Sequence, residues 1–304
     1  MAFRHHVHRL VTRMLPASLA TALQFRGHAR RARTEQATSF AGESEFLDLV
    51  FATLGITGGV VVDIAAGDGV AQSCTLPLFR NPRWSGLAVE CDPEKFARLA
   101  YAYRQFSGVQ LAQAMVTPDT VCELLRAFDV PTAFEFLNLD IDSYDLFVAD
   151  ALLRQFRPRV ISMEVNEKIP PPIVFAVCYD RGFTWDNGPC YGCSITAAAA
   201  CLTRHGYGLI GLQYNNAVFV RADAMGSLPA VTVERAYRTG YRDRPDRLAL
   251  FPWNAVMEDL LTMPPADAVQ AIDERFASHR GEYILSLDSD IHEMLGPHVT
   301  AGTD

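Results

Sequence analysis

Three aspartates occur within six residues at the end of an expected strand. Asp140, Asp142 and Asp145 follow the run FEFLNL, and Glu164 and Asn166 end the next expected strand, RVISMEV. Alternation along an extended chain places Asp140 and Asp142 on one face, and neighbouring strand ends bring Glu164 close to them. Oxygen ligands of this type suit Mg²⁺ or Ca²⁺. The residues therefore predict a divalent-cation site at Asp140, Asp142, Glu164 and Asn166, which would lower the pKa of a bound hydroxyl.

An arrangement without a metal is the alternative. Asp145 would then cap the following helix, and Asp142 would bond to loop amides. In that case Asp142 or Tyr144 is the expected base, because an alcohol does not lose its proton unaided near neutral pH. The catalytic candidates are thus Asp140, Asp142 and Tyr144. His205 follows a helix, and a single histidine there is typical of a capping or surface residue.

A second group of candidate residues lies in the stretch VVDIAAGDGVAQSC, residues 61–74. Asp63 ends an apolar run there, and Asp68 lies in the turn that follows. Small residues in such a turn let backbone N–H groups approach a ligand closely. The glycine spacing is not G-x-G-x-x-G, and Asp68 would repel a pyrophosphate, so a cationic ligand without phosphate, such as S-adenosylmethionine, suits the turn better. The small residues of the turn are Ala65, Ala66, Gly67 and Gly69.

Glu90 ends the next expected strand, SGLAVEC. Ligands of open α/β sheets lie across the carboxyl ends of neighbouring strands. An acid at that position accepts hydrogen bonds from both hydroxyls of a ribose, so Asp63 and Glu90 together indicate a nucleoside site. An ordinary tight turn beside a surface acid is the structural alternative.

Apolar periodicity predicts the elements that position these residues. Strands and helices alternate, which favours a mostly parallel sheet covered on both faces. YGLIGLQYNNAVFVRAD then indicates a hairpin that turns at Asn215–Asn216 and adds an antiparallel last strand. The expected strands are 59–65, 85–91, 109–116, 132–141 and 159–165, and the expected helices are 42–55, 94–106, 119–130, 146–156 and 195–206.

The motifs resemble those of a known family. VVDIAAGDG followed by LAVECDPEKF resembles the first two motifs of class I S-adenosylmethionine-dependent methyltransferases. FEFLNLDIDSYDLFVADALL, RPRVISMEVNEKIPPPI and YGCSITAAAACLTRHGYGLIGLQYNNAVFV resemble the FkbM-like branch, with its DIDxxD and E-x-N strand ends and its YGxS helix start. The likeness spans residues 42–221. Ala65 and Cys74 depart from it, and Ala65 is a mild change if its φ is negative.

The resemblance implies a class I Rossmann-like α/β fold, mostly parallel with an antiparallel last strand, plus an N-terminal basic helix and a C-terminal helical extension. It also implies a role for each matching residue in binding S-adenosylmethionine. These are Asp63, Ala65, Gly67 and Gly69 for the methionine part, Ser73 and Thr75 for its carboxylate, Glu90 for the ribose, Cys91 and Asp92 for the adenine, and Asp140 for the sulfonium.

Charge divides the 304 residues unevenly. Residues 1–34 hold seven arginines and no acid, whereas the remainder holds 20 basic and 35 acidic residues, a net charge of −15. Because residues 35–304 are acidic overall, they lack the basic surface that nucleic-acid binding needs. The chain is expected to comprise a basic N-terminal segment, 1–41, a methyltransferase domain, 42–221, and a helical extension, 222–304.

The basic segment has no apolar run of ~20 residues, so a membrane span is not expected. Three alternatives are open: a solvated or packed helix, peripheral contact of residues 4–33 with an anionic membrane surface, and a targeting peptide. No partner segment is visible in the sequence, so deletion of residues 1–33 is expected to leave the fold intact. Seven scattered cysteines indicate reduced thiols and a cytoplasmic location, with the inner membrane surface as the alternative.

These observations predict an S-adenosylmethionine-dependent O-methyltransferase. Its acceptor would be a hydroxyl of a sugar, a glycolipid or polysaccharide, or a secondary metabolite, with Mg²⁺ as an optional second cofactor. An N-methyltransferase acting on an amine or guanidine, and a cofactor-binding scaffold without catalysis, are the alternatives. A nicotinamide oxidoreductase is disfavoured by Asp68 and the closing hairpin. A homodimer is left open.

Overall fold

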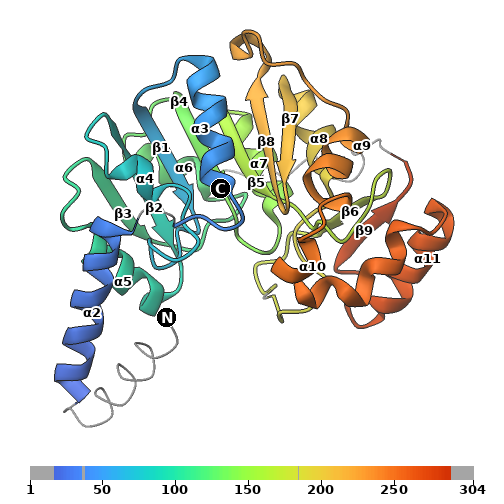
Figure 1. The fold of residues 1–304 in the computed structure, drawn as a ribbon, viewed down its shortest axis with the longest axis horizontal. Coiled ribbons are helices and arrows are strands. Elements are labelled where there is room, and N and C mark those ends of the chain that lie inside the picture. Colours follow the sequence, from blue (N-terminus) through green and yellow to red (C-terminus); the bar gives the residue numbers. More distant parts are fainter. Residues whose placement is uncertain (1–16, 36–37, 184, 289–304) are drawn as a thin grey trace, which may run out of the picture.

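The computed structural model describes residues 17–35, 38–183 and 185–288. A seven-stranded sheet forms its centre, in the order β3-β2-β1-β4-β5-β8-β7 (Figure 1). The first five strands are parallel, and β8 runs antiparallel to both β5 and β7. This confirms the predicted mostly parallel sheet with an antiparallel last strand. The strands are β1 Gly59–Ile64, β2 Trp84–Glu90, β3 Val109–Gln113, β4 Ala133–Leu139, β5 Arg157–Glu164, β7 Tyr207–Gln213 and β8 Asn216–Arg221.

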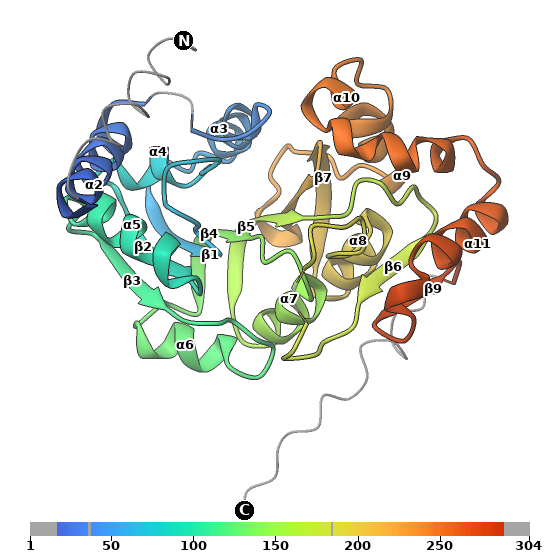
Figure 2. The same cartoon turned by 90° about the horizontal axis from the view of Figure 1, so that it is seen from below.

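Helices cover both faces of the sheet (Figure 2). Adjacent residues of β1 show why, because Val61 packs into one core cluster and Val62 into the other, and neither is exposed to solvent. A strand with two apolar faces needs a helical layer on each side. One layer contains α3 Glu43–Leu54, α4 Leu76–Phe79 and α5 Pro93–Tyr103, and the other contains α6 Val121–Ala127, α7 Asp145–Leu153 and α8 Ile195–Arg204.

The closing hairpin is present, but its turn differs from the prediction. Gln213 pairs with Asn216, so the two-residue turn is Tyr214–Asn215 and the predicted Asn215–Asn216 turn is wrong. Tyr214 takes a φ of 54°. Its buried ring packs against Phe251 and lies under the guanidinium of Arg244. These tertiary contacts outweigh the local preference of asparagine for a turn.

A second, two-stranded sheet was not predicted. In it, β6 Val174–Val177 pairs antiparallel with β9 Tyr283–Ser286. A separate apolar core, which includes Phe175, Met257 and Ile272, joins this sheet to the C-terminal region. The extension is mostly helical, as expected, but its last described element is a strand that pairs with β6 of the preceding region. Its other elements are η1 Ala222–Ala224, α9 Val233–Tyr237, η2 Arg238–Arg242, α10 Arg247–Leu250, η3 Pro252–Leu261, α11 Pro265–Arg275 and η4 Ala277–His279.

The basic segment forms helix α2 Ala17–Thr34, which packs against α5. Ala29 and Ala32 are buried there, and Arg80 Nε donates to the Ala32 carbonyl at 2.6 Å. Of the three alternatives for this segment, a packed helix is therefore confirmed for Ala17–Thr34, although no partner segment was visible in the sequence. Its contacts include the small side chains of Ala29 and Ala32, the buried imidazole of His28 and the ring of Phe25, which packs against Tyr101.

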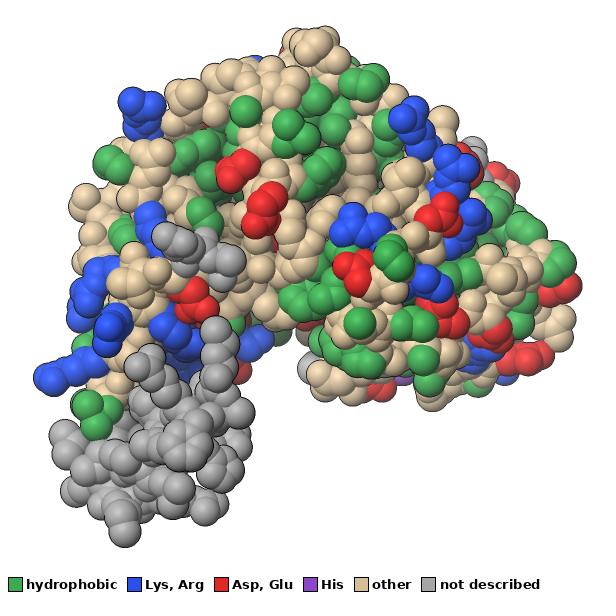
Figure 3. All heavy atoms as spheres, in the orientation of Figure 1, with side chains coloured by type: hydrophobic (Ala, Val, Ile, Leu, Met, Phe, Trp, Pro, Cys, Tyr) green, Lys and Arg blue, Asp and Glu red, His purple; other side chains and the backbone are tan. Residues whose placement is uncertain are grey.

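Lys and Arg side chains gather over α2 and its surroundings, at the lower left of Figure 3. Residues 4–16 of the predicted membrane-contact segment lie outside the described residues. Within the described part of the chain, no helix is long and apolar enough to cross a membrane.

Substitution of two glycines by alanine tests the close contact between β1 and β2. Gly86 of β2 has a φ of 152°, and a Cβ there would lie 1.8 Å from the Val61 carbonyl oxygen. We expect Gly86→Ala to destabilise the protein by roughly 1–3 kcal/mol or more, because the parallel pair β1–β2 cannot separate to admit a methyl group. The control is Gly27→Ala at an exposed position of α2, where a Cβ has no neighbour within 4 Å; this variant should be more stable by roughly 0.5–1 kcal/mol. Urea unfolding measures both, and equal effects would contradict the described β1–β2 contact.

Candidate active site at the carboxyl ends of the strands

Three carboxylates meet where β4 and β5 end. Asp140 follows β4 directly, Asp142 lies two residues on, and Glu164 is the last residue of β5. One oxygen from each lies within 4.8 Å of the others. The chain is not extended at Asp142, which has a φ of 56°, so a turn and not strand alternation brings its carboxylate to the cluster.

The electrostatics of this cluster are unfavourable without compensation. Burial, and then repulsion from neighbouring carboxylates, raises the pKa of both Asp140 and Glu164 well above the usual range. Burial also raises the pKa of Asp142, but a hydrogen bond with Glu164 and then the charges of Lys95 and Lys168 partly oppose that change. Acids this close cannot all ionise unless a cation balances them. The cluster can therefore retain protons or bind a cation.

One donor reaches the cluster from the closing hairpin. Asn215 Nδ2 donates to Glu164 Oε1 at 2.8 Å, whereas Glu164 Oε2 is buried and no donor among the described residues reaches it. Asn215 was predicted only as a turn residue. Its contact with Glu164 depends on the pairing of β8 with β5, which no local pattern reports.

Asp145 and Tyr144 have structural partners. The Asp145 carboxylate accepts hydrogen bonds from the amides of Ile141 and Ser143, at 2.8 and 3.0 Å, and so orders the loop that carries Asp142. Burial raises the pKa of Asp145 to about 6, although these amides oppose the change. Tyr144 donates to the Val116 carbonyl at 3.4 Å, and burial raises the pKa of its hydroxyl. This geometry disfavours Tyr144 as a base.

Asn166 lies just beyond β5 and fixes a loop. Its Nδ2 donates to the carbonyls of Pro189 and Tyr191, at 2.8 and 3.0 Å. Its Oδ1 is buried, and no donor among the described residues reaches it. The oxygen of this side chain is thus the part free to bind a ligand.

Asp63 and its neighbours form a polar cluster beneath the turn after β1. Asp63 is 2% exposed and accepts hydrogen bonds from Thr75 Oγ1 at 2.5 Å and Asn138 Nδ2 at 2.9 Å. Ser73 Oγ accepts from the amide of Leu76 at 3.1 Å. The hydroxyls of Ser73 and Thr75 are therefore engaged within the protein, and Asn138 is a residue of this site that the sequence did not reveal.

Glu90 links the loops that follow β1 and β2. Its Oε2 accepts a hydrogen bond from the amide of Gly67 and its Oε1 from the amide of Asp92, both at 2.8 Å. Asp92 in turn caps α5 through the amides of Glu94 and Lys95. Each carboxylate oxygen has a further lone pair. Glu90 can accept ligand hydroxyls while it holds the two loops, and exposed Cys91 lies between it and the cap.

The turn itself is strained. Ala65 has a φ of 67°, so it is not the mild departure that a negative φ would have made it. A left-handed conformation costs an alanine roughly 1–2 kcal/mol. Gly69 also has a positive φ, and a Cβ there would lie 2.5 Å from Leu99 Cδ1, whereas a Cβ on Gly67 would have no neighbour within 4 Å. The turn also includes buried Ala66. It is packed against α5 at Gly69 and has free space at Gly67.

Helix α2 supports this turn. His28 is buried, and its Nε2 lies 2.7 Å from the carbonyl oxygen of Asp68. The Asp68 side chain accepts hydrogen bonds from the amides of Val70 and Ala71. The basic segment therefore contacts the backbone of the candidate ligand loop.

A buried network connects the C-terminal extension to the site. Glu167 accepts hydrogen bonds from Tyr191 Oη at 2.8 Å, Asn254 Nδ2 at 2.5 Å and Lys168 Nζ at 3.3 Å. All four side chains are at most 5% exposed. The positive charge of Lys168 favours the ionised form of Asp142. Asn254 was not predicted as part of the site, because a buried polar network spanning 87 positions has no local pattern.

Comparisons with known proteins are distant. No protein-family model and no curated protein sequence matches the chain. Solved structures that resemble it include the N-terminal domain of EvdMO1 with SAH bound, with 14% identity, 59% of this chain and 79% of that chain covered, and a TM-score of 0.39. Precorrin-6y C5,15-methyltransferase from Geobacter metallireducens GS-15 has 17% identity, coverages of 62% and 94%, and a TM-score of 0.35.

A SAM-dependent methyltransferase from Aquifex aeolicus has 11% identity, coverages of 59% and 88%, and a TM-score of 0.35. Similarities with such low identities and TM-scores do not support a conclusion about activity. The fold class rests on the strand order of the sheet, and the function is argued from the site.

Glu43 is a buried acid of α3 behind this site that the sequence did not single out. It is 4% exposed and accepts a hydrogen bond from Ser162 Oγ at 3.0 Å. Burial raises its pKa to about 7, against the opposing hydrogen bonds of Ser162 and Cys74. Because the folded pKa is the higher one, the stability that Glu43 contributes is full below pH 4.5 and is lost as the pH rises through about 7.

We therefore expect Glu43→Gln to be nearly neutral at pH 5 and to stabilise the protein at pH 8. The difference should be on the order of 3 kcal/mol, because glutamine has no charge to bury. Urea unfolding at the two pH values measures it. Glu45→Gln, at an exposed position of the same helix, is the control and should show little pH dependence. An equal effect of Glu43→Gln at both pH values would contradict a titrating buried Glu43.

Proposed function

We propose that the chain is an S-adenosylmethionine-dependent methyltransferase of the FkbM-like branch. The observation that carries the proposal is the alignment of three features on one edge of the sheet: the strained turn after β1, Glu90 after β2 and Asp140 after β4. Strand β1 lies between β2 and β4, so a ligand that contacts Glu90 and Asp140 must cross the turn. In open α/β sheets, ligands bind at this edge.

The shape of the site supports an adenosyl ligand with a positive charge. Glu90 would accept the ribose hydroxyls, with Cys91 and Asp92 beside the adenine. The methionine part would cross Ala65, Ala66, Gly67 and Gly69, and the sulfonium would approach Asp140, where negative charge favours a cation. Because Ser73 and Thr75 use their hydroxyls internally, we propose that backbone amides bind the methionine carboxylate.

The proposed acceptor is a hydroxyl of a sugar, glycolipid, polysaccharide or secondary metabolite. Its oxygen forms a bond to the methyl carbon while the carbon–sulfur bond breaks, and the hydroxyl proton passes to Asp142. Alignment of the two reactants supplies much of the rate. Asp142 is the preferred base because burial raises its pKa, which strengthens it as a base, while Glu164, Lys95 and Lys168 limit that rise.

The residues present also fit a hard divalent cation such as Mg²⁺. The donors are oxygens only, and Glu164 Oε2 and Asn166 Oδ1 are buried without a donor among the described residues. Asp140, Asp142, Glu164 and Asn166 would hold the ion. A bound cation supplies Lewis acidity that lowers the pKa of the acceptor hydroxyl.

The three-part division at residues 41 and 221 belongs to the same proposal. Asn254 contacts Glu167, which supports a role for the extension in shaping the acceptor side. Contact of the basic segment with an anionic surface is proposed for the exposed residues Arg26, Arg30 and Arg33 of α2. This contact would locate the enzyme at the cytoplasmic face of a membrane.

Cofactor binding tests the proposal without an acceptor. Calorimetry should show S-adenosylhomocysteine binding, and Glu90→Ala should weaken it by at least about 10-fold, because charge-assisted ribose bonds are lost. Glu94→Ala, at an exposed position of the first turn of α5, is the control and should bind as the unmodified protein does. Tighter binding of NAD than of S-adenosylhomocysteine would refute the proposal.

Turnover measurements test the catalytic role of the acids at the strand ends. With an acceptor found by screening hydroxylated compounds for release of S-adenosylhomocysteine, Asp142→Asn should lower kcat by roughly 100-fold and leave cofactor affinity unchanged. The exposed Asp129→Asn is the control. If Mg²⁺ participates, chelation should abolish turnover and Mg²⁺ should restore it. Unchanged kcat in Asp142→Asn would remove Asp142 as the base, and indifference to chelator would remove the metal.

A further inference from the structure

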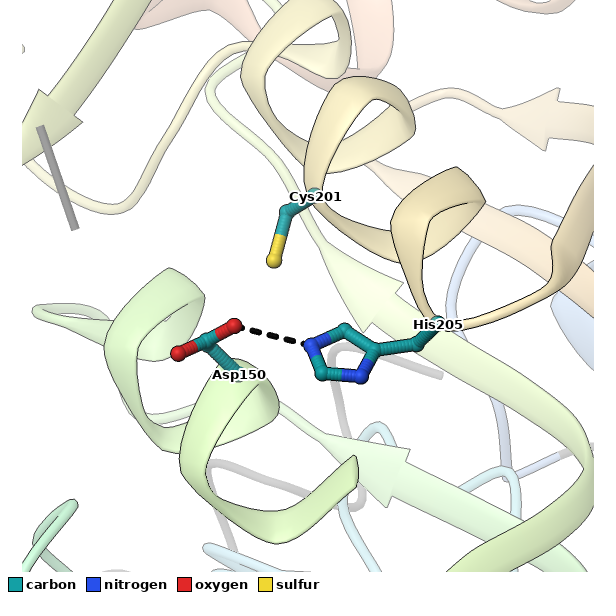
Figure 4. Close-up of side chains that lie close together, drawn as sticks. All are labelled: Asp150, Cys201 and His205. Carbon is teal, nitrogen blue, oxygen red and sulfur yellow. Dashed lines mark hydrogen bonds and ion pairs between the residues drawn. The ribbon is translucent and has the colours of Figure 1, made fainter. Parts of the chain in front are cut away.

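Three metal-ligand side chains meet away from the strand ends, between α7 and α8. Asp150 of α7 and Cys201 and His205 of α8 point toward one another (Figure 4). Their oxygen, sulfur and nitrogen atoms all lie within 4.8 Å of one another. Cys201 and His205 are four residues apart, the spacing that places both side chains on one helix face.

We propose that Asp150, Cys201 and His205 bind a divalent transition metal of the Zn²⁺ class. Zinc takes thiolate, imidazole and carboxylate ligands together, whereas Mg²⁺ and Ca²⁺ take oxygens. The proposal is independent of the methyltransferase assignment, because none of these residues lies at the strand ends. The metal would tie α7 to α8 within one helical layer.

Asp150 is prepared as an anionic ligand. A bound metal would replace the His205 hydrogen bond on Oδ1, which leaves Arg154 as the partner that holds the Asp150 carboxylate in place. His205 Nε2 lies 2.8 Å from Oδ1, and the Arg154 guanidinium donates to Oδ2 at 2.5 Å. A donor on the second oxygen of a carboxylate is the outer contact that orients a metal-bound acid.

Cys201 supplies the soft ligand. Its side chain is fully buried, and burial raises the pKa of its thiol to about 12, so the metal-free thiol keeps its proton. When the metal binds, a sulfur–metal bond replaces the S–H bond and the thiol proton leaves to solvent. His205 binds as the neutral imidazole through Nε2, and any proton on that nitrogen moves to Nδ1 or to solvent.

Backbone carbonyls near the site favour a cation, whereas the positive charges of Arg154 and Arg204 oppose one. Asp150 and Cys201 lie in the last turns of their helices, and His205 is the C-cap of α8, so carbonyl ends with partial negative charge face this region. The His205 side chain is 16% exposed, whereas that of Asp150 is 1% exposed. The histidine side therefore gives the metal a path from solvent and leaves a fourth position for water.

The test is titration of the full, chelator-treated chain with Co²⁺. We expect a thiolate-to-cobalt charge-transfer band that saturates as Co²⁺ is added and disappears when Zn²⁺ is added. Cys201→Ser should abolish the band, and His205→Asn should weaken binding by ~100-fold or more, because even outer-shell changes cost 10–100-fold. Calorimetry in two buffers should show release of a proton from the thiol.

Matched controls separate this site from others. Cys178→Ser and His279→Asn remove one residue of each type elsewhere and should leave the band unchanged. The terminal histidines His5, His6 and His8 can bind Co²⁺ but contribute no thiolate band. A band that persists in Cys201→Ser, or no band in the unmodified chain, would overturn the proposal.

Folding of the variants is checked separately. Cys201→Ala, which suits the alanine-rich helix α8, replaces Cys201→Ser if the serine prevents folding. Zn²⁺ should raise the Tm of the unmodified chain and not that of His205→Asn, whose side chain is partly exposed. An equal rise in both would place the metal elsewhere and refute the assignment.

Discussion

The crowding of three carboxyl groups at the ends of β4 and β5 is the constraint on which the surrounding structure depends. Oxygen atoms of Asp140, Asp142 and Glu164 lie within 4.8 Å of one another; Glu164 is buried and the two aspartates are partly exposed, so repulsion and desolvation both act on the cluster. The structure offsets part of this through the Asn215 amide and the nearby charge of Lys168. The remaining negative charge must be neutralised by protons, by a metal ion or by a cationic ligand.

This requirement explains why segments distant in sequence converge here. Glu167 carries a second buried carboxylate beside the first cluster, and its partners are Lys168, Tyr191 and Asn254. Asn254 comes from the C-terminal extension, so the extension takes part in balancing the polar interior of the sheet. At the other side, His28 of α2 contacts the turn after β1. Both terminal segments are thus part of the framework of the site.

The elements of the sheet could be predicted because their signals are local. Apolar runs, the glycine after α3 and the alternation of strands with helices each lie within a short window of sequence. The strand-end acids could be found for the same reason, since each directly follows an apolar run. The positive φ of Ala65, the Tyr214–Asn215 turn and the β6–β9 pairing could not, because packing between distant segments imposes them. Asn138, Asn215 and Asn254 were missed because amide side chains show their role only through their partners.

The central claim is that an adenosyl cofactor lies across the turn after β1, from Glu90 to Asp140. A crystal structure grown with S-adenosylhomocysteine tests it most directly. We predict ribose hydroxyls at about 2.6–3.2 Å from the Glu90 carboxylate, with the sulfur of the ligand on the Asp140 side of the turn. A ligand bound elsewhere, or one in the turn with Glu90 bonded only to the amides of Gly67 and Asp92, would contradict the claim.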